Sequence, residues 1–399
     1  TIRLDGDAYA RLAAGDPNAP GSREIVWTYP HLDNPADAAF VAPPALNAAG
    51  DVLYIGSVVG RLLAIAATGD NAGELLEYES DSGDRTFLGS SEPFAITTAP
   101  LVATRDDIDA VFVGAANGNL LGIGGDGETL EQIWPNILDS AVGTSPTISD
   151  NGSLYAGSLN SGVFATCPNG VTRYGLANGP TLSTPALGRM GEIEATDEIL
   201  YFGADDGLLR AVREDGILQW SFGFSAPILA APIVLLADDE LASTAAVLAV
   251  DSRGLVVRLD AEGRAEADFE SPDGLGRVLA SPAFAEVGPD DGRLYVASLD
   301  DGLHAIDAET GELRWTWAPG AGIEAAPAVV LSATGDAPPI VVVGANDGRL
   351  YYVRDEGDEP VLVASFDTGS GLPITSSPAV GTDGTTYFGG LDGRVYAVR

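Results

Sequence analysis

Residues 376–398 read SSPAVGTDGTTYFGGLDGRVYAV and contain almost a whole structural unit. Two apolar runs, at 386–389 and 394–398, have the length of β-strands and flank an Asp392-Gly393 pair. Asp-Gly between two apolar runs predicts a tight hairpin, because a type I′ turn needs positive φ at both central residues. A further strand begins at Pro378-Ala379. The unit is therefore a Pro-Ala strand followed by a β-hairpin.

The same unit recurs along the whole chain. Seven earlier copies open at Pro43-Pro44, Ala99-Pro100, Ser145-Pro146, Thr184-Pro185, Ala231-Pro232, Ser281-Pro282 and Ala326-Pro327. The hairpin glycines are Gly60, Gly118, Gly162, Gly207, Gly254, Gly302, Gly348 and Gly393, mostly about 45 residues apart. The wider first gap indicates an insertion, which we place at 71–93. Repeats of this length and pattern predict an all-β chain folded as an eight-bladed β-propeller of four-stranded antiparallel blades.

A fourth strand is marked by aromatic pairs two residues apart, Trp220 with Phe222 and Trp315 with Trp317, which place both rings on one face of a strand. The last copy lacks this strand, because the sequence ends at Arg399. Its counterpart is the apolar run at 25–29, which precedes the first Pro-Ala strand. We therefore expect residues 23–29 to complete the last blade and close the ring, which removes the open edges of the sheet.

These boundaries predict one propeller domain over 23–399 and an N-terminal preamble over 1–22. Short helices are expected at 7–14 and 35–40. The sequence begins with Thr1 and not with methionine, so we expect that a leader has been removed and that the protein is periplasmic, on the cell surface or secreted.

Composition excludes several partners. The chain has 58 acidic and 20 basic residues and a formal net charge of −38. A phosphate surface would be repelled, which excludes nucleic acid. All the basic residues are arginine, so lysine Schiff-base chemistry is excluded. No apolar run approaches the roughly 18 residues of a membrane span, so no membrane insertion is expected.

The sixth copy contains the segment AIDAETGELRW at 305–315. Together with the Pro-Ala, Asp-Gly and tryptophan positions, this segment resembles the PQQ-like β-propeller repeat, and the resemblance extends over 23–399. The repeat is shared by quinone-cofactor dehydrogenases, by the periplasmic lipoprotein of the outer-membrane β-barrel assembly machinery and by other cell-surface proteins. The resemblance implies that Trp27, Trp134, Trp220 and Trp315 pack between blades.

The resemblance also makes demands that this sequence does not meet. A quinoprotein dehydrogenase usually holds its quinone against a disulfide of two adjacent cysteines, with a calcium ion beside it. Cys167 is the single cysteine, so that disulfide cannot form. His31 and His304 are the only histidines, and His304 aligns with Tyr351 and Tyr396 at a packing position. We predict no catalytic residues, no metal site and no cofactor.

The sequence therefore favours a non-enzymatic binding or scaffolding propeller of the cell envelope that binds a protein partner through loops on one face. The candidate residues are Phe224, Arg277 and Glu324, which lie in loops leading to Pro-Ala strands, and the insertion near 81–94 belongs to the same face. Two alternatives stay open. One is a dehydrogenase-like enzyme with PQQ and calcium, and the other is an extracellular module that binds an oligosaccharide through exposed aromatic rings.

Overall fold

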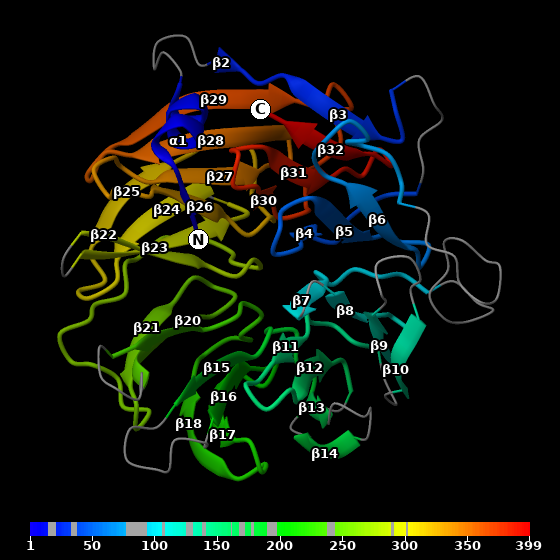
Figure 1. Ribbon diagram of the computed structural model, residues 1–399. Coiled ribbons are helices and arrows are strands. Elements are labelled where there is room, and N and C mark those ends of the chain that lie inside the picture. The colour runs from blue at the N-terminus through cyan, green and yellow to red at the C-terminus, as the bar shows by residue number, and fades with distance from the viewer. Residues whose placement is uncertain are drawn as a thin grey trace. The chain divides into compact units, whose positions relative to one another are not determined.

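The residues that the computed structural model describes form short, mostly antiparallel sheets and one helix (Figure 1). The structure describes residues 1–14, 21–32, 38–76, 94–105, 108–124, 131–137, 141–160, 162–166, 172–176, 179–189, 198–237, 244–288, 291–300 and 302–399. The chain divides into two compact units, and we describe each by itself. The first unit contains Thr1–Ser145 and Ile323–Arg399, and the second contains Pro146–Gly322.

The first unit contains four sheets among its described residues. The first sheet has the order β3 (Ile25–Tyr29), β32 (Val395–Val398), β31 (Thr386–Gly389), β30 (Ala379–Val380). The second is β4 (Ala45–Leu46), β5 (Val52–Gly56), β6 (Leu62–Ala66), and the third is β10 (Glu131–Ile137), β9 (Asn119–Gly124), β8 (Ile108–Gly114), β7 (Leu101–Arg105). The fourth is β1 (Ile2–Leu4), β26 (Ala328–Ser332), β27 (Ile340–Gly344), β28 (Arg349–Asp355), β29 (Pro360–Asp367), β2 (Gly21–Ser22).

The second unit also contains four sheets within the described ranges. Two of them are β11 (Thr147–Ile148), β12 (Leu154–Ser158), β13 (Gly162–Thr166), β14 (Thr172–Leu176) and β15 (Ala186–Arg189), β16 (Glu198–Gly203), β17 (Leu208–Arg213), β18 (Leu218–Gly223). The other two are β19 (Ile233–Leu236), β20 (Thr244–Val250), β21 (Val256–Asp260) and β22 (Ala283–Gly288), β23 (Asp291–Ser298), β24 (Gly302–Asp307), β25 (Leu313–Trp317).

Five sheets have the predicted four strands, one has six because β1 and β2 are added at its edges, and two have only three. The β4–β6 and β19–β21 sheets have three strands each. In each case the chain after the third strand makes one isolated bridge, Ile65 with Leu75 and Leu259 with Ala265, and the described residues that follow form no fourth strand. Neither segment carries an aromatic pair like those of β18 and β25, but β10, β14 and β29 form fourth strands without such a pair. The predicted insertion at 71–93 begins at the first of these points, and its residues 77–93 lie outside the described ranges.

The prediction that the strand at 25–29 completes the last sheet is confirmed. Strand β3 pairs antiparallel with β32, with Trp27 opposite Ala397 and Thr28 opposite Tyr396. Main-chain bonds between Glu24 and Arg399 extend the pairing in both directions, at 3.0 and 2.9 Å. The two ends of the sequence are thus joined within one sheet.

The N-terminal residues also pair with strands of the propeller repeat. Strand β1 pairs parallel with β26, and β2 pairs parallel with β29. Helix α1 (Gly6–Ala13) lies between them, with Asp5 as its N-cap. Its apolar side includes Ala8 and Leu12, which are buried in the core of the β26–β29 sheet. The N-terminal preamble predicted at 1–22 is therefore hydrogen-bonded, through β1 and β2, to the same sheet as β26–β29. The second expected helix, at 35–40, is absent at 38–40, and its other residues lie outside the described ranges.

Glycine at the end of a second strand makes room for a neighbouring sheet. A Cβ built on Gly203, the last residue of β16, would lie 2.2 Å from Cγ2 of Ile228 in the loop that leads to β19. The same arrangement pairs Gly56 with Ile96, Gly114 with Val142, Gly344 with Ile374 and Gly389 with Phe40. In each pair the apolar side chain is almost fully buried. We call this contact the glycine joint.

Main-chain hydrogen bonds accompany the joints: Val142 and Ile374 make one each, to Ala115 O and Ala345 O, and the joints of Ile228, Phe40 and Ile96 make two. The N–H of Ile228 donates to Ala204 O at 3.2 Å, and the N–H of Ser252 in the next hairpin donates to Pro227 O at 2.8 Å. Equivalent pairs are Phe40 to Gly390 with Val58 to Ala39, Ile96 to Ser57 with Ala116 to Ala95, and Thr181 to Ser158 with Asp205 to Pro180. These bonds pair polar groups that the buried loop would otherwise leave unsatisfied.

Tryptophans form a second contact between neighbouring sheets. Trp220 donates from Nε1 to Ala261 O at 2.8 Å, and a Cβ on Gly263 would lie 2.4 Å from its ring. Trp27 donates to Ala67 O at 3.1 Å and lies against Gly73 in the same way. The packing role implied for Trp27 and Trp220 agrees with these contacts. The side chain of Trp134 lies outside the described set.

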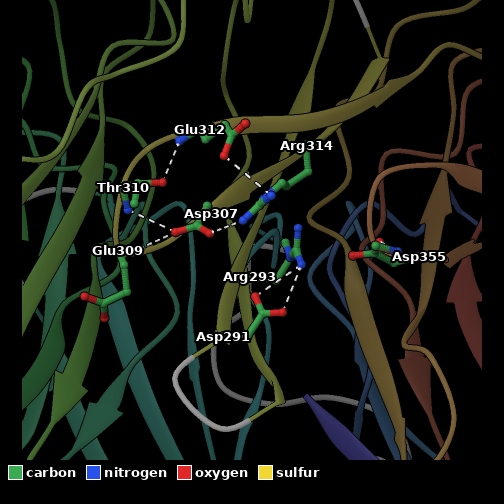
Figure 2. Close-up of polar contacts among 9 residues, drawn as sticks. Asp291, Arg293, Asp307, Glu309, Thr310, Glu312, Arg314 and Asp355 are labelled. Atoms are coloured by element: carbon green, nitrogen blue, oxygen red, sulfur yellow. Dashed lines mark hydrogen bonds and ion pairs between the residues drawn. The ribbon is translucent and has the colours of Figure 1, made fainter.

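An acidic residue fixes the turn between β24 and β25 (Figure 2). The carboxylate of Asp307 accepts hydrogen bonds from the N–H groups of Glu309 and Thr310, both at 3.0 Å, and from Nη2 of Arg314 at 2.7 Å. Burial acts to raise the pKa of Asp307, but the hydrogen bonds from Arg314 and the turn outweigh it and lower the pKa to about 2. Asp307 is therefore ionised over a wide pH range.

This lowered pKa links stability to pH. The pKa of Asp307 is lower in the folded state than the value of about 3.9 expected after unfolding. Its contribution is therefore complete above that value and is lost as the pH falls towards 2. We expect Asp307→Asn to lower the free energy of unfolding by about 2 kcal/mol at pH 7 and by less at pH 3. Urea unfolding of both proteins at the two pH values measures this, and an equal loss at both would contradict the assignment.

The glycine joint makes a second prediction. We expect Gly203→Ala to lower the free energy of unfolding by about 1–3 kcal/mol, because the added methyl group overlaps Ile228. Gly223→Ala in the same sheet is the matched control, since a Cβ there would meet only Leu208 Cδ2 at 3.7 Å. Urea unfolding compares the two variants. Equal stability of both would show that the joint does not need glycine.

Candidate functional site

The loops that carry the predicted site residues are held next to the hairpins of their own unit. Phe224 follows β18, and its N–H donates to Gly207 O at 2.7 Å. Its ring is half-buried and packs edge-on against Phe222, with 5.5 Å between the ring centres. Part of the ring therefore stabilises the loop and part faces solvent.

Arg277 lies in the equivalent loop before β22. Its backbone N–H donates to Asp300 Oδ2, and its carbonyl accepts from Leu299 N, both at 2.9 Å. The side chain is exposed, and its guanidinium forms no hydrogen bond or ion pair with the described residues. The backbone of Arg277 is thus held by hydrogen bonds, while its guanidinium group is exposed.

Glu324 belongs to the first unit, so its position is described apart from the other two candidates. Its side chain is exposed and accepts a hydrogen bond from Asn346 Nδ2 at 3.0 Å. This bond joins the loop before β26 to the hairpin between β27 and β28. One carboxylate oxygen of Glu324 therefore already has a hydrogen-bond partner within the first unit.

Sequence reasoning missed Arg253, at the tip of the hairpin between β20 and β21. It is exposed, and its guanidinium has no partner in the part of the chain that the structure describes. The neighbouring Ser252 donates from its N–H to Pro227 O at 2.8 Å and accepts at its carbonyl from Val278 N at 3.3 Å. The hairpin with Arg253 therefore lies between the Phe224 loop and the Arg277 loop. We call Phe224, Arg253 and Arg277 the arginine face.

Arg253 and Arg277 are unpaired within the described residues, although the chain contains 58 acidic residues. Arg258, on the strand that follows Arg253, is only 9% exposed. It contacts Glu266 at 2.8 Å, Glu309 at 3.2 Å and the carbonyl of Ala308 at 3.0 Å. The arginine face thus offers cationic donors that form no ion pair with a carboxylate of the described residues, and such donors can bind an acidic or carbonyl-rich surface.

His304 occupies a packing position on the third strand, as the alignment predicts. Its ring is buried, with Nδ1 3.0 Å from Thr316 Oγ1. Tyr351 and Tyr396 stand at the same place in their sheets, and each hydroxyl contacts the aspartate of its own hairpin at 2.5 Å. Within the described ranges no group of three or more His, Cys, Asp or Glu side chains is placed to hold a metal ion. Cys167 lies outside these ranges.

A groove of about 510 Å³ lies in the first unit between β3 and the segment after β6. Its walls are Trp27 to His31 on one side and Ala72 to Leu75 on the other. Trp27 is only 8% exposed and its indole N–H already binds Ala67 O, so its ring does not offer an open face for a sugar. In the described part of the chain no helix is both long and apolar enough to span a bilayer.

Comparisons with known proteins agree with the repeat pattern. Residues 268–399 match a family model described as the outer membrane protein assembly factor BamB. No curated protein sequence matches the chain. The structure is similar to BamB from Moraxella catarrhalis, with a TM-score of 0.64 and 16% identity over 94% of this chain and 99% of that chain.

Two further solved structures are similar in fold. Sqt1 of Saccharomyces cerevisiae has a TM-score of 0.68 and 10% identity over 96% of this chain and 98% of that chain. The C-terminal WD40 domain of Sif2 has a TM-score of 0.68 and 12% identity over 95% of this chain and 98% of that chain. At such low identity these likenesses show the fold alone. The chain therefore has the fold of a β-propeller, and it resembles the PQQ-like propellers that include BamB.

Proposed function

We propose that this chain is a non-enzymatic, protein-binding scaffold of the cell envelope, built as a closed propeller of eight blades. The eight sheets and the pairing of β3 with β32 support this architecture. The family model that matches residues 268–399 describes an outer membrane protein assembly factor, which favours a periplasmic or surface location. The acidic composition favours a protein partner over nucleic acid.

The observation that carries the proposal is the arginine face. Arg253 and Arg277 are exposed and unpaired among the described residues, yet the backbone on both sides of them is hydrogen-bonded. A fixed backbone with free charged ends is suited to binding, because little order has to be gained when a partner docks. Phe224 supplies an apolar contact beside them, and Glu324 supplies a carboxylate in the equivalent loop of the first unit. The partner surface that fits the arginine face carries carboxylates next to an apolar side chain.

Site-specific photocrosslinking in the native host tests the proposal. We expect a benzoylphenylalanine placed at Phe224 to give a discrete crosslinked protein, because that position lies on the binding surface. The same probe at Glu262, an exposed residue of the turn after β21, is the matched control and is expected to give none. Mass spectrometry of the crosslinked band identifies the partner.

Charge reversal makes the experiment specific. We expect Arg253→Glu together with Arg277→Glu to reduce the Phe224 crosslink at least about tenfold, since two charge-assisted contacts become repulsive. The melting temperature of the double variant should stay close to that of the parent, because neither side chain is paired with the described residues. An unchanged crosslink in a folded double variant would contradict the arginine face as the binding surface.

A further inference from the structure

We propose that the outer edge of β18 binds an extended segment of a partner protein as an added β-strand. The site lies in the second unit and does not depend on the arginine face. The inference comes from the first unit, where the chain itself adds a strand to the outer edge of the equivalent strand β29.

The pairing of β2 with β29 shows the geometry of such an addition. Gly21 lies opposite Ala364 and Ser22 opposite Ser365, in parallel orientation. The next residue, Arg23, donates its N–H to Ser365 O at 3.0 Å. The N–H and C=O of one strand residue point the same way, so both main-chain groups of Ser365 point outward from the sheet.

Strand β18 has the same register and the same bulge. Trp220 pairs with Ala211, and Ser221 pairs with Arg210. In the first unit Ala364 pairs with Tyr352 and Ser365 with Tyr351, and both sheets shift register at the next pair. Ala211 and Tyr352 are each the fourth residue after their hairpin glycines, Gly207 and Gly348, so their partners Trp220 and Ala364 occupy equivalent positions. Ser221 and Ser365 are equivalent in the same way. The main-chain groups of Ser221 therefore point outward too.

The edge of β18 is open where that of β29 is covered. Strand β18 ends its sheet, and no main-chain hydrogen bond joins its outer side to a described residue. Ser221 is exposed, whereas Ser365 is half-buried and Ala364 is fully buried under the N-terminal segment. The site is thus the unoccupied counterpart of the place that β2 fills.

The sequence of β18 does nothing to block pairing. Protein edges are usually protected by charged residues or proline, but residues 218–223 read LQWSFG. At the start of the strand, Ile217 and Leu218 are 53% and 52% exposed. Two large apolar side chains beside free main-chain groups form a template for an extended chain.

The negative charge around β18 indicates which kind of partner segment would bind there. The turn just before β18 carries Glu214 and Asp215, and the whole chain carries a formal net charge of −38. A second copy of the chain would bring like charges together, which opposes self-pairing. The segment that fits is apolar and β-branched, with basic residues at its N-terminal end when it lies parallel to β18, as β2 does to β29.

The test uses the full chain and a fluorescent peptide of sequence KRVTVTV, with binding followed by fluorescence anisotropy. We expect saturable binding that Ser221→Pro weakens about tenfold, because proline removes an outward N–H and leaves the pairing with β17 intact. Leu218→Lys should weaken binding to a similar extent through like charge and an edge-guarding side chain. Ser221→Thr is the matched control and should bind like the parent.

Two methylated peptides keep the test decisive even if a variant fails to fold. Methylation of one alternate set of peptide amides removes the donors that face β18, and methylation of the other set leaves them free. We expect only one of the two peptides to lose binding to the parent protein. Equal binding of both, or binding unchanged by Ser221→Pro in a folded protein, would overturn the proposal. A dimer of the chain that Ser221→Pro dissolves would assign the edge to a second copy instead.

Discussion

The glycine joint is the contact on which the arrangement of neighbouring sheets depends. A single repeat unit cannot bury its apolar faces alone, so each sheet must pack on the next. At Gly203 the absence of a side chain lets Ile228 reach the backbone, and the loop bonds to Ala204 while it holds the next hairpin through Pro227. One small residue therefore fixes the spacing of two sheets and the path of the loop between them. The tryptophans at the outer strands brace the same neighbours from a second point.

Much of the fold could be predicted from the repeated sequence pattern. The pairing of β3 with β32 was predictable because the last copy lacks a strand and the first has one to spare. The N-terminal pairing was not predictable, since Ile2–Leu4 and Gly21–Ser22 occur once and carry no repeat signal. The missing fourth strand after β21 was not predictable from the loss of the aromatic pair, since β10, β14 and β29 form fourth strands without one. Arg253 was not predictable either, because whether a turn arginine is paired depends on neighbours that are far away in sequence.

The same joints explain how binding surfaces arise on a rigid frame. Main-chain bonds occupy the backbone of the loops and hairpins, so the side chains at their tips are free to vary without cost to the fold. Where those side chains are Arg253 and Arg277, an acidic protein displays isolated positive charge. At β18 no described strand is added to the sheet, and its edge is open within the described residues. The exposed arginines and the open edge of β18 both lie at positions that the repeat does not need for packing between sheets.

Residue-resolved hydrogen exchange tests this account most directly. The amide hydrogens of Phe40, Ile96, Thr181 and Ile228 lie in loops, yet each donates to the carbonyl of a neighbouring hairpin. If these bonds hold the sheets together, the four amides should exchange as slowly as those in the middle of the strands. Exchange at the rate of unprotected loop amides would contradict the account and would show that the sheets are held by side-chain packing alone.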